Sequence, residues 1–205
     1  MAEPQVQGNA QHRSPLAGVV ATGRIGRAIG VAGVRIREVT DAAGVAIVAR
    51  KGRGADVAAI LSQHAGSPLL DAAKRTAGNG LAISGMGPGQ WLAMAQSTGA
   101  GTRIDALKAD LDGMAAVTDQ GDGRVILEIS GARARDALAK GIAVDLRPGV
   151  FKVGDLAQTS ASHIGLQIAL IDAAPTFEIV SGRSTAGSLW AWLTASVAEY
   201  GIDVA

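Results

Sequence analysis

The feature that most constrains the fold is a strict alternation of large apolar residues with small or polar ones toward the C-terminal end. Within residues 163–172, Ile164, Leu166, Ile168 and Leu170 are separated by a glycine, a glutamine and an alanine. Successive side chains of a β-strand point to opposite faces, so a period of two places all the large apolar side chains on one face. The pattern therefore predicts a strand with one face buried in a core.

The rest of the sequence repeats an order of strands followed by one helix. Apolar runs typical of strands occupy residues 34–40, 44–52, 79–84, 90–96, 114–120, 123–130, 156–160, 163–172 and 176–181. Apolar residues at helical spacing occupy residues 54–66, 102–113, 131–141 and 184–201. Strands grouped between single helices predict an α+β fold with mainly antiparallel sheets and helices packed on them, in two similar β-β-α halves. We expect residues 31–205 to form a single domain.

Several local signals indicate where these elements begin and end. The strands at 34–40 and 44–52 flank a predicted turn at residues 41–44, and those at 114–120 and 123–130 flank one at residues 121–123. Thr102 and Ser130 are the expected N-caps of the helices that follow them. In the second of these helices, Asp136 and Lys140 stand four residues apart and are expected to pair.

The composition excludes several classes of function. The formal charge is +1 and aromatic residues make up 3% of the sequence, so neither nucleic acid nor an anionic membrane surface is an expected partner. No cysteine occurs, which excludes disulfides and thiolate metal sites. Glu3 stands where a signal peptide carries basic residues, and no uncharged apolar run approaches the roughly 20 residues of a membrane span. These observations predict a soluble, cytoplasmic protein.

Residues 1–30 differ from the remainder of the sequence. They are rich in glycine, glutamine, proline and alanine and show little periodicity, and arginines follow at positions 24, 27, 35 and 37. Such a composition is typical of a segment that lacks a packed core of its own. We predict a flexible N-terminal arm, which either becomes ordered on an acidic partner or stays solvated.

Two glycine-rich stretches raise the question of a phosphate-binding loop. A dinucleotide loop needs its glycines between a strand and the N-terminus of a helix. Residues 85–89 instead lie between two strand-like runs, and Pro88 removes an amide donor, so this stretch predicts a hairpin turn. Gly99 and Gly101 do precede a helix, but Asp105 would place a negative charge in its first turn. A loop-to-helix junction is the favoured interpretation there.

The titratable residues form no recognisable site in the sequence. His12, His64 and His163 are far apart, whereas a metal site needs three or four converging ligands. Asp119 and Asp122 flank a predicted turn and are expected to be solvated. Neither a nucleophile elbow nor a P-loop motif occurs. We therefore expect no catalytic, cofactor-binding or metal-binding residue in this chain.

The last predicted helix carries two tryptophans with different expected environments. At 100° per residue, Trp190 lies at the edge of the apolar stripe, whereas Trp192 points away from it. Tryptophan is a preferred anchor at protein interfaces. We predict that Trp190 is buried, and that Trp192 either contacts a partner or packs against its own domain.

Several segments resemble a known family. The most distinctive are DQGDGRVILEISGARARDALAKG at residues 119–141, the RS-A-SLW-WL pattern at 183–193 and EYG at 199–201. The DL-P, F-VG--AQT and FEI elements, SPLAG near the start and GPGQWLAMA at 87–95 add to them. Together, over roughly residues 14–202, they resemble the γ subunit of heterotetrameric sarcosine oxidase, although Gly89 and Gln90 replace two acidic residues of the family pattern.

This resemblance implies a subunit of a flavoenzyme complex that oxidatively demethylates sarcosine or a related N-methyl amine. The implied partners are α, β and δ subunits, and FAD, FMN, NAD, tetrahydrofolate and zinc would be held by those subunits. The implied fold is that of folate-dependent aminomethyltransferase domains. Those domains carry an acid around the strand that matches residues 163–172, where this sequence has none before Asp172.

The sequence thus favours a structural and assembly role for the chain within such a complex. Two alternatives remain at this stage. One is a stand-alone folate-binding enzyme of the aminomethyltransferase type. The other is an adaptor for tRNA-modifying machinery, which is disfavoured because basic residues do not cluster outside the N-terminal arm.

Overall fold

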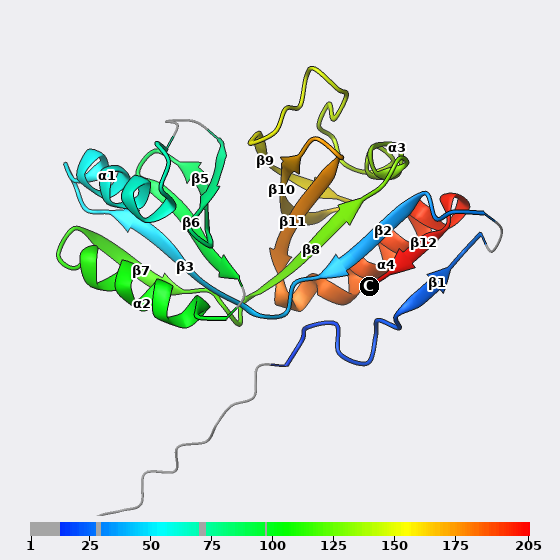
Figure 1. Ribbon diagram of the computed structural model, residues 1–205, viewed down its shortest axis with the longest axis horizontal. Coiled ribbons are helices and arrows are strands. Elements are labelled where there is room, and N and C mark those ends of the chain that lie inside the picture. Colours follow the sequence, from blue (N-terminus) through cyan, green and yellow to red (C-terminus); the bar gives the residue numbers. More distant parts are fainter. Residues whose placement is uncertain (1–12, 28–29, 70–72, 97) are drawn as a thin grey trace, which may run out of the picture.

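The computed structural model describes residues 13–27, 30–69, 73–96 and 98–205, which form two β-sheets and four α-helices (Figure 1). The larger sheet has the strand order β1 (Gly23–Ile25), β12 (Ile202–Val204), β2 (Val34–Glu38), β8 (Arg124–Ser130), β11 (Thr176–Gly182), β10 (Ile164–Asp172) and β9 (Leu156–Ala161). The smaller sheet has the order β4 (Arg75–Gly78), β5 (Leu81–Gly87), β6 (Gln90–Gln96), β3 (Ala42–Ala49) and β7 (Ala115–Asp119). All neighbouring strands are antiparallel except β12 and β2, which confirms the expected α+β class.

Each sheet buries one of its faces under two helices. The helices α1 (Gly54–Ala65) and α2 (Ala100–Asp110) contact the five-stranded sheet, while α3 (Ala134–Leu138) and α4 (Ala186–Val197) share a core with the seven-stranded sheet. Short 3₁₀ turns, Arg183–Thr185 and Ala198–Tyr200, flank α4. Leu166, Ile168 and Leu170 all lie in the larger core, so the alternation in this strand did predict its buried face.

The five-stranded sheet is built from one continuous stretch, β3 to β7, which is inserted between β2 and β8 of the seven-stranded sheet. β2 belongs to the seven-stranded sheet and β3 to the five-stranded one, and the same change of sheet occurs between β7 and β8. The two connections lie together in the middle of Figure 1. The predicted turn at 41–44 is wrong in extent, because β3 begins at Ala42 and residues 42–44 pair with β6. Backbone pairing thus extends further than the turn-forming residues indicate.

Part of the predicted N-terminal arm packs against the larger sheet. Leu16 is 1% exposed and belongs to the core of that sheet. The Ser14 hydroxyl donates to both carboxylate oxygens of Glu38, at 2.7 and 2.8 Å, and β1 pairs with β12. Residues 1–12 and 28–29 lie outside the described residues, and the division into an arm and a single domain stays a prediction.

The ends of the helices differ in several places from the sequence-based expectation. α1 does end at Gly66, whose left-handed φ of 66° closes the helix as predicted. Thr102 is not an N-cap, because the left-handed Gly99 is the N-cap of α2, three residues earlier. Ser130 is not one either, because it pairs with Thr176 inside the sheet and α3 begins only at Ala134.

The predicted ion pair between Asp136 and Lys140 is also wrong. Asp136 accepts a hydrogen bond from the Arg133 guanidinium at 2.9 Å. Lys140 instead reaches across to α4 and the turn after it, where it pairs with Glu199 and lies 4.6 Å from the centre of the Tyr200 ring. The short α3 ends too early for an i,i+4 pair to form, and the side chains find tertiary partners.

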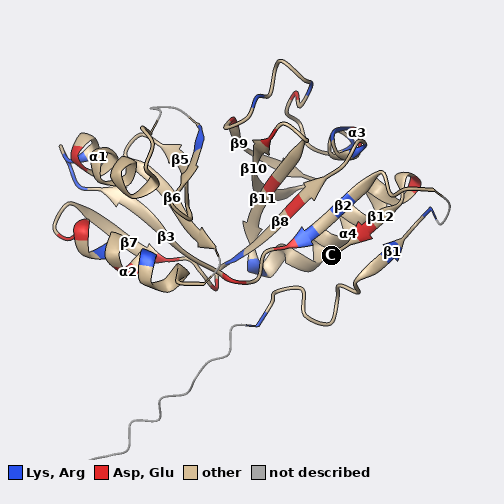
Figure 2. Ribbon diagram, in the orientation of Figure 1, with Lys and Arg blue, Asp and Glu red and all other residues tan. Residues whose placement is uncertain are grey.

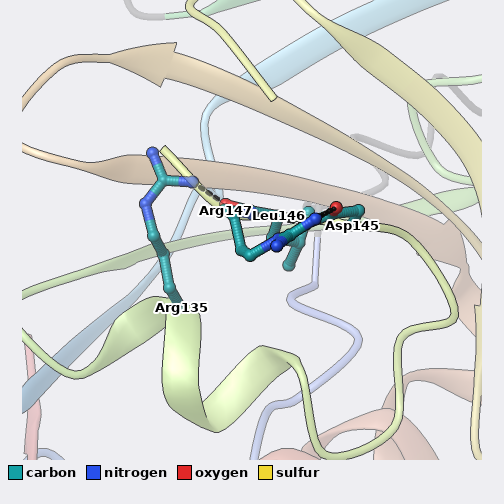
Figure 3. A network of polar contacts seen from close by, with 4 residues as sticks. All are labelled: Arg135, Asp145, Leu146 and Arg147. Carbon is teal, nitrogen blue, oxygen red and sulfur yellow. Dashed lines mark hydrogen bonds and ion pairs between the residues drawn. The ribbon is translucent and has the colours of Figure 1, made fainter. Parts of the chain in front are cut away.

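A long irregular segment between α3 and β9 is attached to the larger core at several points. The Arg135 guanidinium, which lies 5.1 Å from the Phe177 ring centre, donates to the carbonyl oxygen of Leu146 (Figure 3). Hydrogen bonds from the Arg147 side chain and backbone lower the pKa of Asp145 to about 2. Phe151 stacks on Phe177 with ring centres 6.4 Å apart. These contacts hold the segment against the sheet although it has no regular structure.

Candidate functional site between the two sheets

The face of each sheet that carries no helix is directed toward the other sheet, and three of the buried polar side chains, Ser84, Gln167 and Glu178, lie there. In β10, the apolar residues point to the helices and Gln167 points the opposite way, where its Nε2 donates to the Ser84 hydroxyl of β5 at 2.8 Å. A small apolar cluster of Leu92, Met94, Ile126 and Val180 occupies the centre of the same interface. The interface is therefore partly apolar and partly hydrogen-bonded.

The principal charged contact between the sheets joins Arg75 of β4 to Glu178 of β11. Arg75 donates from Nε and Nη2 to the two carboxylate oxygens of Glu178, at 2.7 and 2.8 Å. The two side chains are only 10% and 6% exposed. Gln96 of β6 adds a longer contact of 3.4 Å to the same carboxylate. This geometry satisfies Glu178 with internal donors and leaves it poorly suited to act as a free acid or base.

Glu178 was missed in the sequence analysis, although its position in the sequence indicates a buried charge. It is the one acid in an apolar strand run, between Phe177 and Ile179. A charged side chain at such a position is buried only if it has a partner. The partner, Arg75, lies about a hundred residues earlier, and nothing in its local sequence indicates that the two would meet.

The two sheets are also joined along their edges. The chain at Lys74 and Asp155 forms an isolated antiparallel bridge, in which the Arg75 amide donates to the Gly154 carbonyl at 2.8 Å. The Lys74 ammonium pairs with the Asp155 carboxylate at the same place. The edge of the smaller sheet is thus continued by the segment that leads into β9.

A pocket of about 370 Å³ remains between the sheets. Met86 and Leu92 of the smaller sheet face Val180 and Gln167 of the larger sheet across it. The Gln158 side chain, which also lines the pocket, donates to the Met86 carbonyl oxygen at 2.7 Å. This pocket is the part of the interface with both free space and polar groups.

The first glycine-rich stretch is a hairpin, as predicted. Gly87 of β5 pairs with Gln90 of β6, which leaves Pro88 and Gly89 as the two turn residues, and Gly89 has the positive φ of 67° that such a turn uses. An adjacent pocket of about 630 Å³ reaches from this hairpin to α1 and is lined largely by apolar residues such as Leu69 and Trp91. No cationic side chain of the described residues lines it.

The second glycine-rich stretch is the predicted junction between β6 and α2. Gly99 stands before the helix with a φ of 82°, and the Arg103 guanidinium donates to the Thr98 carbonyl at 3.1 Å. Asp105 is exposed and lies 3.7 Å from the Lys108 ammonium. The residues form the predicted loop-to-helix junction, in which no side chain caps the helix.

The histidines and the turn aspartates are dispersed. The His64 ring contacts the Asp110 carboxylate at 2.8 Å, His163 occupies the exposed β9–β10 turn with a φ of 71°, and His12 lies outside the described residues. Asp119 accepts the Gly121 amide at 2.9 Å. Within the described ranges, no three His, Cys, Asp or Glu side chains converge on a point that could hold a metal ion.

Asp172, the acid at the end of the alternating strand, has a local role in the β10–β11 turn. Its carboxylate accepts the backbone amides of Ala174 and Thr176 at 2.8 and 2.9 Å. Burial raises the pKa of Asp172, but the hydrogen bonds from Thr176 and Ala174 outweigh burial, so its pKa lies below its ordinary value. The Asp172 carboxylate is therefore ionised and stabilises the turn. Asp172 is not among the residues that line the pocket between the sheets.

Trp190 and Trp192 both pack within the molecule. Trp190 is 7% exposed, as predicted. Trp192 is half-buried and packs against the same core, with its indole so close to Gly141 that a Cβ added there would lie 2.7 Å from Nε1. Trp192 thus packs within its own fold, and its contact with a partner stays a prediction.

Charged residues of both signs occur on both sheets (Figure 2). Figure 2 shows lysine and arginine interspersed with aspartate and glutamate over both sheets in this view. Among the described residues, no helix has the length and apolar character needed to traverse a lipid bilayer.

The α+β fold of the chain is shared with an aminomethyltransferase. The structure superposes on glycine cleavage system aminomethyltransferase T from Bartonella henselae with a TM-score of 0.62 and 14% identity, over 84% of this chain and 48% of that chain. It superposes on a chain of heterotetrameric sarcosine oxidase from Corynebacterium sp. U-96, solved in complex with pyrrole 2-carboxylate, with a TM-score of 0.77 and 25% identity. That match covers 92% of this chain and 95% of the other.

A family model described as sarcosine oxidase, gamma subunit family, matches residues 51–199. The chain therefore belongs to the sarcosine oxidase gamma subunit family. Among curated protein sequences, none matches it significantly.

Proposed function

We propose that this chain is the gamma subunit of a heterotetrameric, sarcosine-oxidase-type flavoenzyme and that its role is structural. The observation that carries the proposal is the superposition on a chain of a heterotetrameric sarcosine oxidase, which spans nearly the whole of both chains. The contacts between the sheets support a structural role. Arg75 and Glu178 neutralise each other there, and Asp172 serves a turn.

The proposal extends to the partners and to the reaction. The complex contains α, β and δ subunits, oxidatively demethylates sarcosine or a related N-methyl amine, and works in the cytoplasm. FAD, FMN, NAD, tetrahydrofolate and zinc are held by the other subunits. The gamma chain contributes surface and shape to the assembly and supplies no reacting group.

Purification of the tagged chain from cells that express it natively tests this proposal. We expect three further polypeptides to copurify, with a flavin spectrum and sarcosine-dependent oxygen consumption in the assembled fraction. The same chain produced alone is expected to be colourless and inactive toward sarcosine. An untagged culture processed in parallel is the control for proteins that bind the resin.

Two results would contradict the proposal. A stoichiometric flavin spectrum, or oxidation of sarcosine, from the isolated chain would place the reaction on this subunit. Saturable binding of tetrahydrofolate to the isolated chain, with aminomethyl transfer and without copurifying subunits, would instead favour the stand-alone folate-dependent enzyme.

A further inference from the structure

The pocket between the sheets has features of a small-ligand site that the proposed structural role does not explain. Its volume of about 370 Å³ lies within the range of small-molecule sites. Its apolar walls are Met86, Leu92 and Val180, and its polar groups belong to Arg124, Gln158 and Gln167. An apolar pocket with a few polar groups is the usual arrangement for recognising a small amphipathic molecule.

The space exists because one position in the pocket wall has no side chain. Gly165 lies two residues before Gln167 on β10 and is therefore on the same face of the strand. A Cβ built at Gly165 meets no atom within 4 Å, and its φ lies outside the left-handed range. Neither backbone conformation nor crowding requires glycine here, so what the glycine provides is the open volume itself.

Gln167 carries an unused acceptor at this pocket. Its residue is 5% exposed, and its Nε2 donates to Ser84. Its Oε1 is buried and has no hydrogen-bond partner among the described residues. A buried carbonyl without a hydrogen-bond partner is energetically unfavourable, so a ligand N–H that reaches it would be bound favourably.

Arg124 supplies a cation at the opposite side of the larger sheet's inner face. It lies on β8, where it pairs in register with Gly182, and its Nε donates to Gln120 at 3.1 Å. None of the ion pairs found between described residues engages its guanidinium. The remaining N–H groups are suited to a carboxylate.

We propose that this pocket binds a small carboxylate that also bears an N–H donor and an apolar body, that is, an apolar or N-substituted amino acid. The carboxylate binds Arg124, the N–H group binds Gln167 Oε1, and the apolar part lies against Met86, Leu92 and Val180. All of these residues belong to this chain. The inference therefore does not depend on the assembly proposed above.

Binding of leucine and two truncated analogues to the full-length chain tests the assignment. The analogue 4-methylpentanoate lacks the amino group, and 3-methylbutylamine lacks the carboxylate. Saturation-transfer NMR and calorimetric titration are expected to give a Kd below about 1 mM for leucine. Each analogue is expected to bind about tenfold or more weakly, because one polar contact is lost.

Three substitutions assign the contacts. Gly165→Val fills the pocket and is expected to abolish leucine binding, while Gly101→Val, at an equally open glycine on α2, leaves it unchanged. In Gln167→Met, leucine is expected to bind no better than 4-methylpentanoate. In Arg124→Gln, it is expected to bind no better than 3-methylbutylamine. Thermal melting of each variant verifies that the fold is retained.

The inference is overturned if leucine, proline and sarcosine all fail to bind at 10 mM, a limit of about 3 kcal/mol. It is equally overturned if Gly165→Val binds leucine as well as the parent chain does, or if both analogues match leucine. Binding of tetrahydrofolate without any amino acid would overturn it as well. None of these results affects the copurification test, so the two proposals fail separately.

Discussion

Arg75 and Glu178 show how much a single pair of side chains contributes to the joining of the two sheets. Both are buried, and the guanidinium makes two hydrogen bonds to the carboxylate. We predict that Arg75→Ala lowers the free energy of unfolding by about 3–5 kcal/mol, because it leaves a buried carboxylate without its counter-charge. Urea denaturation measures this loss. Arg53→Ala, which breaks an exposed pair with Asp56, is the control and should cost at most about 1 kcal/mol.

The double variant Arg75→Met with Glu178→Leu separates a charge effect from a packing effect. Removal of both charges eliminates the uncompensated carboxylate, so the double variant should be clearly more stable than Arg75→Ala. If the double variant is as unstable as the single one, the pair matters through its shape, and the electrostatic account is wrong.

The lowered pKa of Asp172 predicts how the free energy of unfolding changes at low pH. Its pKa is lowered in the folded chain, so its contribution is fully present above its unfolded pKa, near 4, and disappears as the pH falls through the folded value. Asp172→Asn removes this titration, and we expect its urea midpoint to fall less steeply than that of the parent chain below about pH 4. Asp105→Asn, at an exposed position on α2, is the matched control. Identical slopes for parent and Asp172→Asn would refute the assignment.

At the scale of whole elements, α4 is held against the segment that follows α3 by the contact between Trp192 and Gly141. The indole atoms Nε1, Cζ2 and Cε2 lie 2.7–2.9 Å from the position of an added Cβ. We predict that Gly141→Ala costs about 1–3 kcal/mol, because the indole must move away from the core. Thermal and urea unfolding measure the loss.

A double-mutant cycle tests the cause of that loss. In a Trp192→Ala background the added methyl group has room, so Gly141→Ala should then be nearly neutral. Additive effects of the two substitutions would show that Gly141 is required for some reason other than the indole. Gly187→Ala, on an open position of α4, controls for glycine replacement as such.

Most elements could be predicted from the sequence, whereas their ends and their pairing could not. Alternation in β10 and helical spacing in α1 and α4 are local patterns, and local patterns determine which face is buried. The expected cap at Thr102 failed because Gly99 offered an earlier left-handed turn, and that choice depends on how β6 approaches the helix. Turn residues at 121–123 indicated a reversal between strands, but the strands on either side belong to different sheets.

For the molecule as a whole, the contacts between the sheets predict cooperative unfolding. The apolar cluster around Leu92 and Val180 and the edge bridge at Lys74 both join elements of the two sheets. We propose that residues 31–205 form one domain, and we expect amides in β6 and β10 to exchange with the same global free energy of opening. Hydrogen exchange measured by NMR checks this. Clearly lower protection throughout the five-stranded sheet would indicate two independent units.

The candidate site lay largely beyond sequence reasoning because it is assembled from both sheets. Gln167 appeared in the sequence only as a polar residue in an alternating strand, and Gly165 as a small one. Their place in a pocket becomes evident only from the structure. There Gln167 bonds to Ser84 and shares the pocket lining with Met86, both on a hairpin some eighty residues earlier. The prediction of a hairpin turn at residues 85–89 was confirmed, because proline and glycine determine the turn through their own backbone preferences.

The position of β12 between β1 and β2 has a consequence for the way the chain is made. A ribosome delivers β1 and β2 early, whereas Ile202–Val204, which pairs with both of them, follows every other described strand in the sequence. Until then β2 displays an unpaired row of amides and carbonyls on that side, the kind of edge that recruits other strands. A translation product that stops before Ile202 would keep this edge open. Cellular proteases and chaperones could then distinguish it from a chain that contains β12.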